Sequence, residues 1–206
     1  MSTTGEVTAQ NDGDRVDGRT LRRTRNRTAV IVALLEIIRE GNLHPGASEI
    51  ADRAGVSHRS IFRYFDDLDD LVRTSIDHAF DEAGPLADIP DIGEGPLSER
   101  ITNFVGARLD LFQLVDGTMQ LARMRAPSIA SINEGIAQIA ELFRVQIADH
   151  FADELDALPE ADRPLLVDGI LVMTSYDSFS IHVRLLGSDI ERTRAAWITA
   201  ISAMLG

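Results

Sequence analysis

Apolar residues recur at helical spacing along most of the chain, and the second half shows no alternating strand pattern. Thr28–Glu40 carries a broad apolar stripe, which Gly41 and Pro45 bring to an end. A loop rich in proline and glycine is expected at residues 84–96, after a helix at about 67–83. Further helices are predicted at about 97–116, 117–125, 128–156, 161–187 and 189–205. The pattern therefore predicts an all-α protein of about nine helices.

The residues around position 55 have the pattern of two short helices joined by a tight turn. Ile50 lies on the apolar side of the first helix, and Gly55 is placed to end it because glycine enters the left-handed conformation at little cost. Ser57 is expected to cap the second helix, on which Ile61 and Phe65 point inward. The residues left facing outward on that helix are His58, Arg59, Ser60, Arg63 and Tyr64.

The outward face of this second helix offers guanidinium, hydroxyl, imidazole and phenol groups. These groups match the phosphates and base edges of DNA, so the segment is predicted to be a helix-turn-helix. The alternative interpretation is a solvated helical hairpin with a basic face. The predicted groove contacts are Arg59, Ser60, Arg63 and Tyr64, with Ser57 and His58 near phosphate.

The segment Ala47–Phe65, ASEIADRAGVSHRSIFRYF, resembles the helix-turn-helix of the TetR family of bacterial transcriptional regulators. The resemblance covers roughly residues 25–80 and includes the acidic start of the next helix. It implies a three-helix DNA-binding head and a helical body that binds an effector and forms a homodimer. Phe62 stands where the family usually has a tyrosine that contacts phosphate, and Leu68 replaces a frequent lysine. Both replacements remove contacts to the DNA backbone rather than to bases.

Charge is distributed unevenly along the 206 residues, whose net charge is −13. Residues 19–65 carry nine arginines against four acidic residues, a net charge of +5. Residues 66–206 carry ten arginines against twenty-five acidic residues, a net charge of −15. Positive charge is therefore gathered where the helix-turn-helix is predicted, as expected of a DNA-binding surface.

The N-terminal residues 1–18 are polar and aperiodic and are predicted to be a disordered tail. The DNA-binding domain is then expected at residues 19–66, and an effector-binding and dimerisation domain at 67–206. The arginine-rich run after the tail is expected to follow phosphates or to enter the minor groove, with a solvated charge run as the alternative. The predicted DNA contacts outside the second helix are Arg22, Arg23, Arg25, Thr28 and Ser48.

The last two predicted helices are apolar on more than one side, which indicates a second partner for them. The simplest partner is the same pair of helices in another subunit. Aromatic and methionine residues with a few polar groups also predict a small-molecule pocket in the body, with plain core as the alternative. The predicted ligand contacts are Phe104, Arg108, Phe112, Met124, Phe143, Tyr176 and Phe179.

The sequence gives little indication of an enzyme, a metal site or a membrane protein. The chain has no cysteine, no motif of a nucleotide-binding loop or hydrolase, and histidines without metal-ligand spacing, so neither a cofactor nor a metal is predicted. No membrane span or signal region is recognised, which predicts a cytoplasmic protein. The prediction is a repressor, not an enzyme, released from a pseudo-palindromic operator by an effector. The alternatives are an activator, a small-molecule sensor or carrier without DNA binding, and an enzyme using Asp177 and His182.

Overall fold

The computed structural model describes residues 10–206, and in that range it contains helices and no strand. The chain separates into two compact units, Met1–His78 and Ala79–Gly206, which we call the head unit and the body unit. The boundary lies inside a helix, further along the chain than the predicted division at residue 66.

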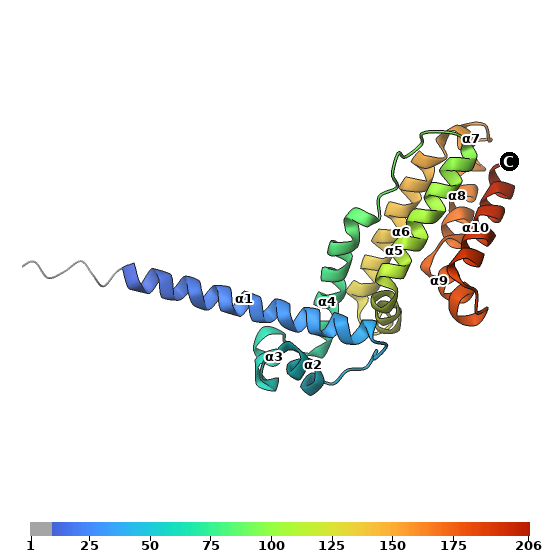
Figure 1. The fold of residues 1–206 in the computed structure, drawn as a ribbon. Coiled ribbons are helices and arrows are strands. Elements are labelled where there is room, and N and C mark those ends of the chain that lie inside the picture. The colour runs from blue at the N-terminus through green and yellow to red at the C-terminus, as the bar shows by residue number, and fades with distance from the viewer. Residues whose placement is uncertain (1–9) are drawn as a thin grey trace, which may run out of the picture. The chain divides into compact units, whose positions relative to one another are not determined.

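The head unit is built on the apolar face of its first helix. Val30, Leu34 and Ile38 on this helix are each at most 1% exposed, and Ile50 and Ile61 from the next two helices are also buried. This small core holds the helix-turn-helix against the first helix (Figure 1). The helices are α1 (Gln10–Arg39), α2 (Ala47–Ala54), α3 (His58–Tyr64) and α4 (Leu68–Ala83), the last of which continues into the body unit.

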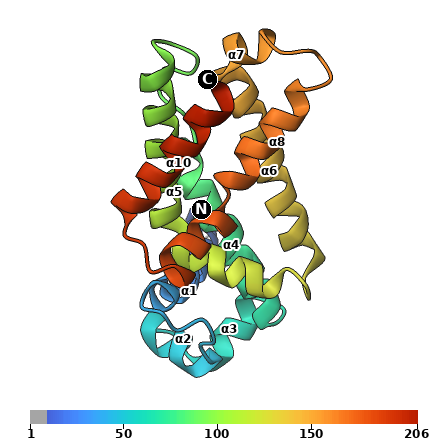
Figure 2. The same cartoon turned by 90° about the vertical axis from the view of Figure 1, so that its right-hand side faces the viewer.

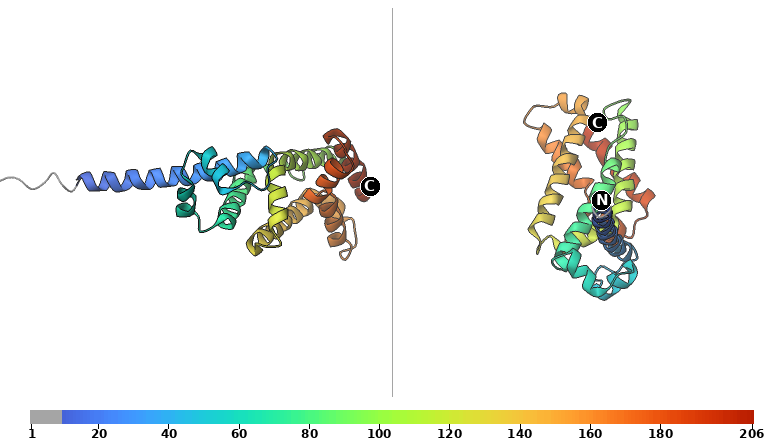
Figure 3. Two further views of the ribbon diagram at one scale, coloured as in Figure 1. Left: turned by 90° about the horizontal axis from the view of Figure 1, so that it is seen from below. Right: turned by 90° about the vertical axis from the view of Figure 1, so that its left-hand side faces the viewer.

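Helix α1 begins at Gln10, well before the predicted start at Thr28 (Figures 1 and 3). Residues 1–9 of the predicted tail lie outside the described residues, whereas residues 10–18 are helical, which corrects that part of the prediction. The apolar stripe could not reveal this extension, because the side chains from Thr20 to Thr28 are largely exposed and need no apolar face. Arginine, which is frequent here, also favours helix.

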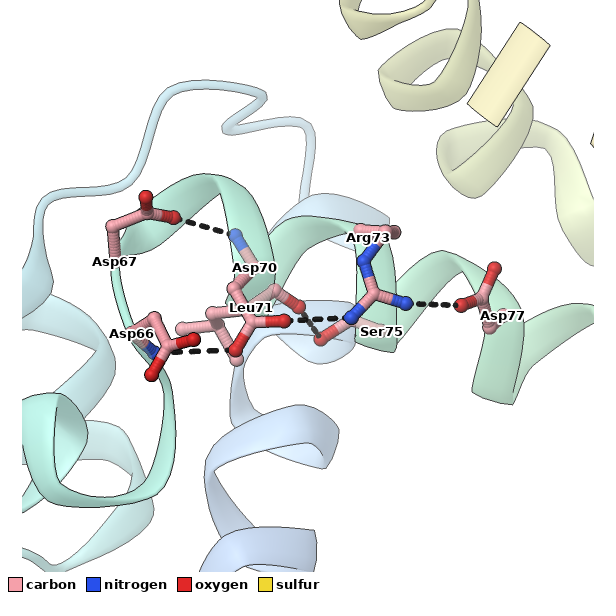
Figure 4. A network of polar contacts seen from close by, with 7 residues as sticks. All are labelled: Asp66, Asp67, Asp70, Leu71, Arg73, Ser75 and Asp77. Atoms are coloured by element: carbon pink, nitrogen blue, oxygen red, sulfur yellow. Dashed lines mark hydrogen bonds and ion pairs between the residues drawn. The ribbon is translucent and has the colours of Figure 1, made fainter. Parts of the chain in front are cut away.

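The acidic residues before and within the first turn of α4 cap that helix (Figure 4). The Asp67 carboxylate accepts a hydrogen bond from the backbone N–H of Asp70 at 2.8 Å, and the backbone N–H of Asp66 donates to the Asp70 carboxylate at 3.2 Å. Arg73 then pairs with Asp70 at 2.7 Å and with Asp77 at 3.1 Å. These bonds satisfy backbone donors that the start of a helix leaves free, as expected for acids at this position.

The body unit packs long helices around an aromatic core (Figure 2). Phe104, Phe112, Phe151 and Trp197 are each at most 3% exposed, and α10 packs on α5 while α6 packs on α8. The elements are η1 (Gly84–Leu86), α5 (Leu97–Arg125), α6 (Ala130–His150), α7 (Ala152–Asp156), α8 (Arg163–Met173), α9 (Tyr176–Ser180), the π-helical turn η2 (Ile181–Leu185) and α10 (Ile190–Leu205).

Helix α5 is continuous where two helices were predicted. Gly117 lies within it and does not end it, although the helix changes direction toward its C-terminal end (Figure 3). Conversely, the predicted helix 128–156 is divided at Phe151, whose backbone leaves the helical region with φ −115° and ψ 29°. No glycine or proline marks this helix end in the sequence, so the break at a buried aromatic residue could not be predicted.

The predicted helix 161–187 is divided into α8, α9 and η2. The Thr174 hydroxyl donates to the carbonyl of Ile170 at 2.7 Å, and the Ser175 hydroxyl accepts from the backbone N–H of Ser178 at 3.2 Å. Such side-chain bonds compete with the helical ladder and start a new helix. The last helix is capped by Asp189, whose carboxylate accepts from the N–H of Arg192 at 2.7 Å.

A buried polar network holds the loop before α5. The His150 Nδ1 atom accepts from the N–H of Gly93 at 3.1 Å, and its Nε2 atom lies 2.9 Å from the carbonyl of Arg100, to which it donates. The Arg100 guanidinium donates to the carbonyl of His150 at 2.7 Å and forms an ion pair with Glu154. Burial lowers the pKa of His150, and the hydrogen bond to the Arg100 carbonyl acts in the opposite direction.

This network predicts a pH dependence of stability. Because the folded protein holds His150 neutral while the unfolded chain takes up a proton near pH ~6.5, the free energy of unfolding should fall as pH drops below about 6.5, by at most ~1.4 kcal/mol per pH unit. Urea denaturation at a series of pH values measures the slope. A His150→Gln variant should lose this part of the pH dependence. A His44→Gln variant should keep it, because His44 is exposed. An unchanged slope in His150→Gln would contradict the assignment.

Candidate functional site

The turn between α2 and α3 has the geometry predicted for it. Gly55 has φ +65°, the left-handed conformation, and its N–H donates to the carbonyl of Asp52 at 3.2 Å. The Ser57 hydroxyl accepts from the N–H of Ser60 at 3.3 Å, and the two hydroxyl oxygens lie 2.8 Å apart. The turn and the cap fix the direction in which α3 leaves the head core.

The outer face of α3 is basic and open to solvent. Arg59, Arg63 and His58 are exposed, as predicted, and Ser60 is half-buried. Phe62 is 46% exposed, and its ring lies tilted against that of His58, with 5.2 Å between the ring centroids. The exposed phenyl ring adds an apolar group to this face, of the kind that contacts the methyl group of thymine.

Tyr64 does not face outward, and this part of the prediction is wrong. Its side chain is 8% exposed, and its hydroxyl oxygen accepts from Asn26 of α1 at 3.3 Å and from Arg63 at 2.7 Å. The hydrogen bond from Asn26 lowers the pKa of Tyr64, Arg63 acts in the same direction, and burial opposes both. Position 64 lies one turn after buried Ile61, so it shares the inward face with Phe65. Tyr64 therefore positions Arg63.

One arginine of α1, Arg27, lies beside the C-terminal end of α3. The Arg27 guanidinium sits over the Phe65 ring, 4.9 Å from its centroid, and the Asn26 bond to Tyr64 joins the same two helices. Arg53, by contrast, is engaged by Glu40 at 2.8 Å and is not offered to a ligand. The predicted contacts outside α3 are all exposed: Arg22, Arg23, Arg25 and Thr28 on α1, and Ser48 on α2.

The body unit contains a largely apolar cavity of about 440 Å³. Its walls come from the C-terminal end of α4 and the segment after it, and from α5, α6, α8 and α9. Of the predicted ligand contacts, Phe112, Phe143 and Tyr176 line it, whereas Phe104, Arg108, Met124 and Phe179 do not. Phe104 and Phe179 belong to the core around it. Lining residues that the sequence analysis missed include Phe80, Ala83, Val115, Met119, Ile139 and Leu171.

Few polar groups meet the cavity. The Tyr176 hydroxyl donates to the carboxylate of Asp116 at 2.7 Å, and burial together with this acid raises the pKa of Tyr176. Arg123 and Asp177, which both line the cavity, form an ion pair at 2.5 Å. The Asp177 carboxylate is thereby taken by Arg123, and no bond between it and His182 is found among the described residues.

An exposed apolar surface lies on the last helices of the body unit. Leu165 and Val172 of α8 are each 69% exposed, and Leu185 of η2 is 77% exposed. Trp197 and Ile201 of α10 are buried in the core and do not belong to this surface. Large exposed apolar patches on proteins often mark sites of contact with another protein.

The comparisons with known proteins agree with this geometry. Residues 30–74 match the family model described as bacterial regulatory proteins of the tetR family. No protein with a curated description matches the chain. A tetR-family transcriptional regulator from Streptomyces coelicolor has a similar structure, with a TM-score of 0.71 and 18% identity over 87% of this chain and 79% of that one.

Two further solved structures share the fold. A transcriptional regulator from Rhodococcus sp. Rha1 matches with a TM-score of 0.66 and 16% identity, over 89% of this chain and 95% of its own. The multidrug binding protein EbrR, solved with imidazole, matches with a TM-score of 0.59 and 18% identity, over 90% and 95% of the two chains. These matches confirm the predicted fold and the resemblance on which it was based. In the part of the chain that the structure describes, no helix is long and apolar enough to span a membrane.

Proposed function

From its TetR-family N-terminal domain and the fold it shares with that family's regulators, we propose that this protein is a ligand-responsive transcriptional regulator that binds DNA as a homodimer. The observation that carries the proposal is the exposed pair Arg59 and Arg63 on α3, a helix that is held by a capped turn and lies in the basic stretch of residues 19–65. Forked guanidinium groups on a helix of this kind fit guanine edges in the major groove.

The remaining basic groups of the head unit then contact the DNA backbone. Arg22, Arg23 and Arg25 lie on α1, which packs beside α3 and brings phosphate contacts to the same surface. Ser57 and His58 at the start of α3 are placed for a phosphate as well, since the N-terminus of a helix attracts anions. Contacts to phosphate fix the register, and contacts to bases select the sequence.

The homodimer forms through the exposed apolar surface of α8 and η2, with α10 beside it. Leu165, Val172 and Leu185 would be covered by the same residues of a second copy, in an isologous contact. A two-fold dimer presents two α3 helices, so the operator is pseudo-palindromic, with half-sites about one helical turn or a little more apart.

The cavity of the body unit is the effector site. Its volume of about 440 Å³ and its apolar walls suit a small lipophilic molecule. The multidrug binding protein EbrR shares this fold, which supports a small-molecule role for the body. An effector that binds the DNA-incompetent state more tightly shifts the population away from DNA. The protein then acts as a repressor where its operator lies so as to block the promoter. An activator would need an operator placed to recruit the polymerase.

Selection of bound sequences from random duplex DNA, read at two salt concentrations, tests the proposal. A two-fold symmetric consensus is the expected result, with weaker retention at the higher salt concentration. If no sequence is enriched, the protein is better explained as a small-molecule sensor or carrier whose head unit binds another protein.

Replacing Arg23 with alanine should weaken binding to all DNA sequences alike. Arg23 is exposed on α1 and is expected to contact phosphate, so the slope of log Kd against log salt should decrease by about 1. Arg53→Ala is the matched control, because Arg53 is held by Glu40 and should leave the slope unchanged. Fluorescence anisotropy with a labelled duplex measures both. Equal slopes in the wild type and in Arg23→Ala would contradict the prediction that α1 contacts the DNA backbone.

A further inference from the structure

Arg108 is a cation buried in the body unit without a counter-ion. It lies on α5 and is 1% exposed, and one of its N–H groups donates to the neutral side-chain oxygen of Gln146 at 2.8 Å. Among the described residues no carboxylate forms an ion pair with it, and burial lowers the pKa of Arg108 to about 9. Its charge is met by aromatic faces, with the guanidinium carbon 3.5 Å from the centroid of Phe143 and 5.3 Å from that of Phe104.

Burying the Arg108 charge in this way costs free energy in the protein without a ligand. Taking a guanidinium group out of water is unfavourable unless it is paired and its hydrogen bonds are satisfied. Cation–π contacts and one neutral acceptor compensate only part of that cost. The other buried arginine of this region, Arg100, shows the usual solution, because it is paired with Glu154. The site around Arg108 has the cation and lacks the anion.

Arg108 lies immediately behind one end of the cavity. Leu111 and Phe112, one turn further along α5, line the cavity, as does Phe143 of α6. Gln146, one turn beyond Phe143 on α6, donates from its Nε2 to the carbonyl of Ala87 at 3.1 Å, and Ala87 is also a lining residue. Arg108 and Gln146 thus form a polar layer at this end. The Phe143 ring, which covers the guanidinium and faces the cavity, separates them from it.

We propose that the cavity takes a lipophilic molecule bearing one carboxylate, and that Arg108 becomes the counter-ion of that carboxylate when the Phe143 ring turns aside. The apolar part occupies the space between α5, α6 and α8, and the guanidinium offers a forked pair of donors to the carboxylate. A neutral molecule of the same shape leaves the buried charge unpaired. The inference rests on the effector site proposed above, and it is independent of DNA binding.

The test compares two probes with the same alkyl chain, decanoate and decanol. Isothermal titration calorimetry on the full chain gives Kd for each, and the ratio Kd(decanol)/Kd(decanoate) measures the preference for the carboxylate. Arg108→Met keeps an apolar side chain of similar length and should lower this ratio about tenfold or more. Arg163→Met is the matched control. It removes an arginine of the body unit that is paired with Asp156 at 2.7 Å and does not line the cavity, and it should leave the ratio unchanged.

Arg108→Gln serves as a second variant, because it keeps a polar group opposite Gln146 while removing the charge, and it should lower the ratio in the same way. Thermal unfolding of each variant checks that it is folded. An unchanged ratio in both Arg108 variants, a fall in Arg163→Met instead, or no binding of decanoate to the wild type would each overturn the proposal. Retention of operator DNA is measured separately. A protein that prefers decanoate through Arg108 but retains no DNA would contradict the proposed function and leave this inference standing.

Discussion

Replacing Trp197 with alanine is expected to lower the free energy of unfolding by about 3–5 kcal/mol. Trp197 is 1% exposed and is among the largest side chains buried in the body unit. Its ring meets Phe112 edge to face, with 6.4 Å between the centroids, so the substitution also removes support from a wall of the cavity. Urea denaturation followed by circular dichroism measures the loss, and binding of the effector probes should weaken in parallel.

The control for this substitution is Trp197→Phe. The indole Nε1 has no hydrogen-bond partner among the described residues, and an unpaired buried N–H costs about 1–3 kcal/mol. Phenylalanine keeps much of the ring volume and removes that N–H, so its net effect should be well under half that of alanine. If both variants lost the same stability, the ring volume would not be what Trp197 contributes.

Replacing Arg59 and Arg63 together with alanine is expected to weaken binding to the selected operator by about 2–6 kcal/mol, since each forked contact to a base is worth about 1–3 kcal/mol. Each single variant should relax the sequence preference at one position of each half-site. Arg63 is held by the Tyr64 hydroxyl at 2.7 Å, so its direction is fixed before DNA arrives. Anisotropy titrations with the operator and with an unrelated duplex measure the specificity ratio.

Arg53→Ala provides the control for this pair as well, because its guanidinium is engaged within the head unit. The double variant should retain most of its weak binding to the unrelated duplex, as the phosphate contacts from α1 remain. Wild-type affinity for the operator in the double variant would mean that α3 does not read the bases.

Local features of the sequence predicted local structure well. Gly55, Ser57 and Asp189 act through bonds within a few residues, so their roles in the turn and caps could be deduced from residue type and position alone. The N-terminal extension of α1 could not be deduced, because an exposed helix leaves no apolar pattern. Tyr64 was wrongly predicted to face outward. Positions three and four residues after Ile61 can both lie on the inward face of α3, and the spacing alone does not show that Tyr64 is buried there together with Phe65.

The cavity shows a different limit. Phe112 and Phe143 line it while Phe104 and Phe179 fill the core, and no property of a phenylalanine in the sequence separates the two groups. Phe80 and Ala83 were missed because they lie at the end of the helix predicted at about 67–83, which was not assigned to the pocket. Arg108 was recognised as polar on an apolar helix, but its lack of a partner is visible only when the neighbouring helices are in place.

The buried hydroxyl of Tyr64 has one more consequence. Its oxygen receives hydrogen bonds from both Asn26 and Arg63, which occupies its two lone pairs. Among the residues described, no bond from the phenol hydrogen to an acceptor is found, so this donor remains for an acceptor that binds beside α3. An incoming oxyanion would complete a chain of donors that runs from α1 through the phenol, and would leave both helices more tightly joined than before.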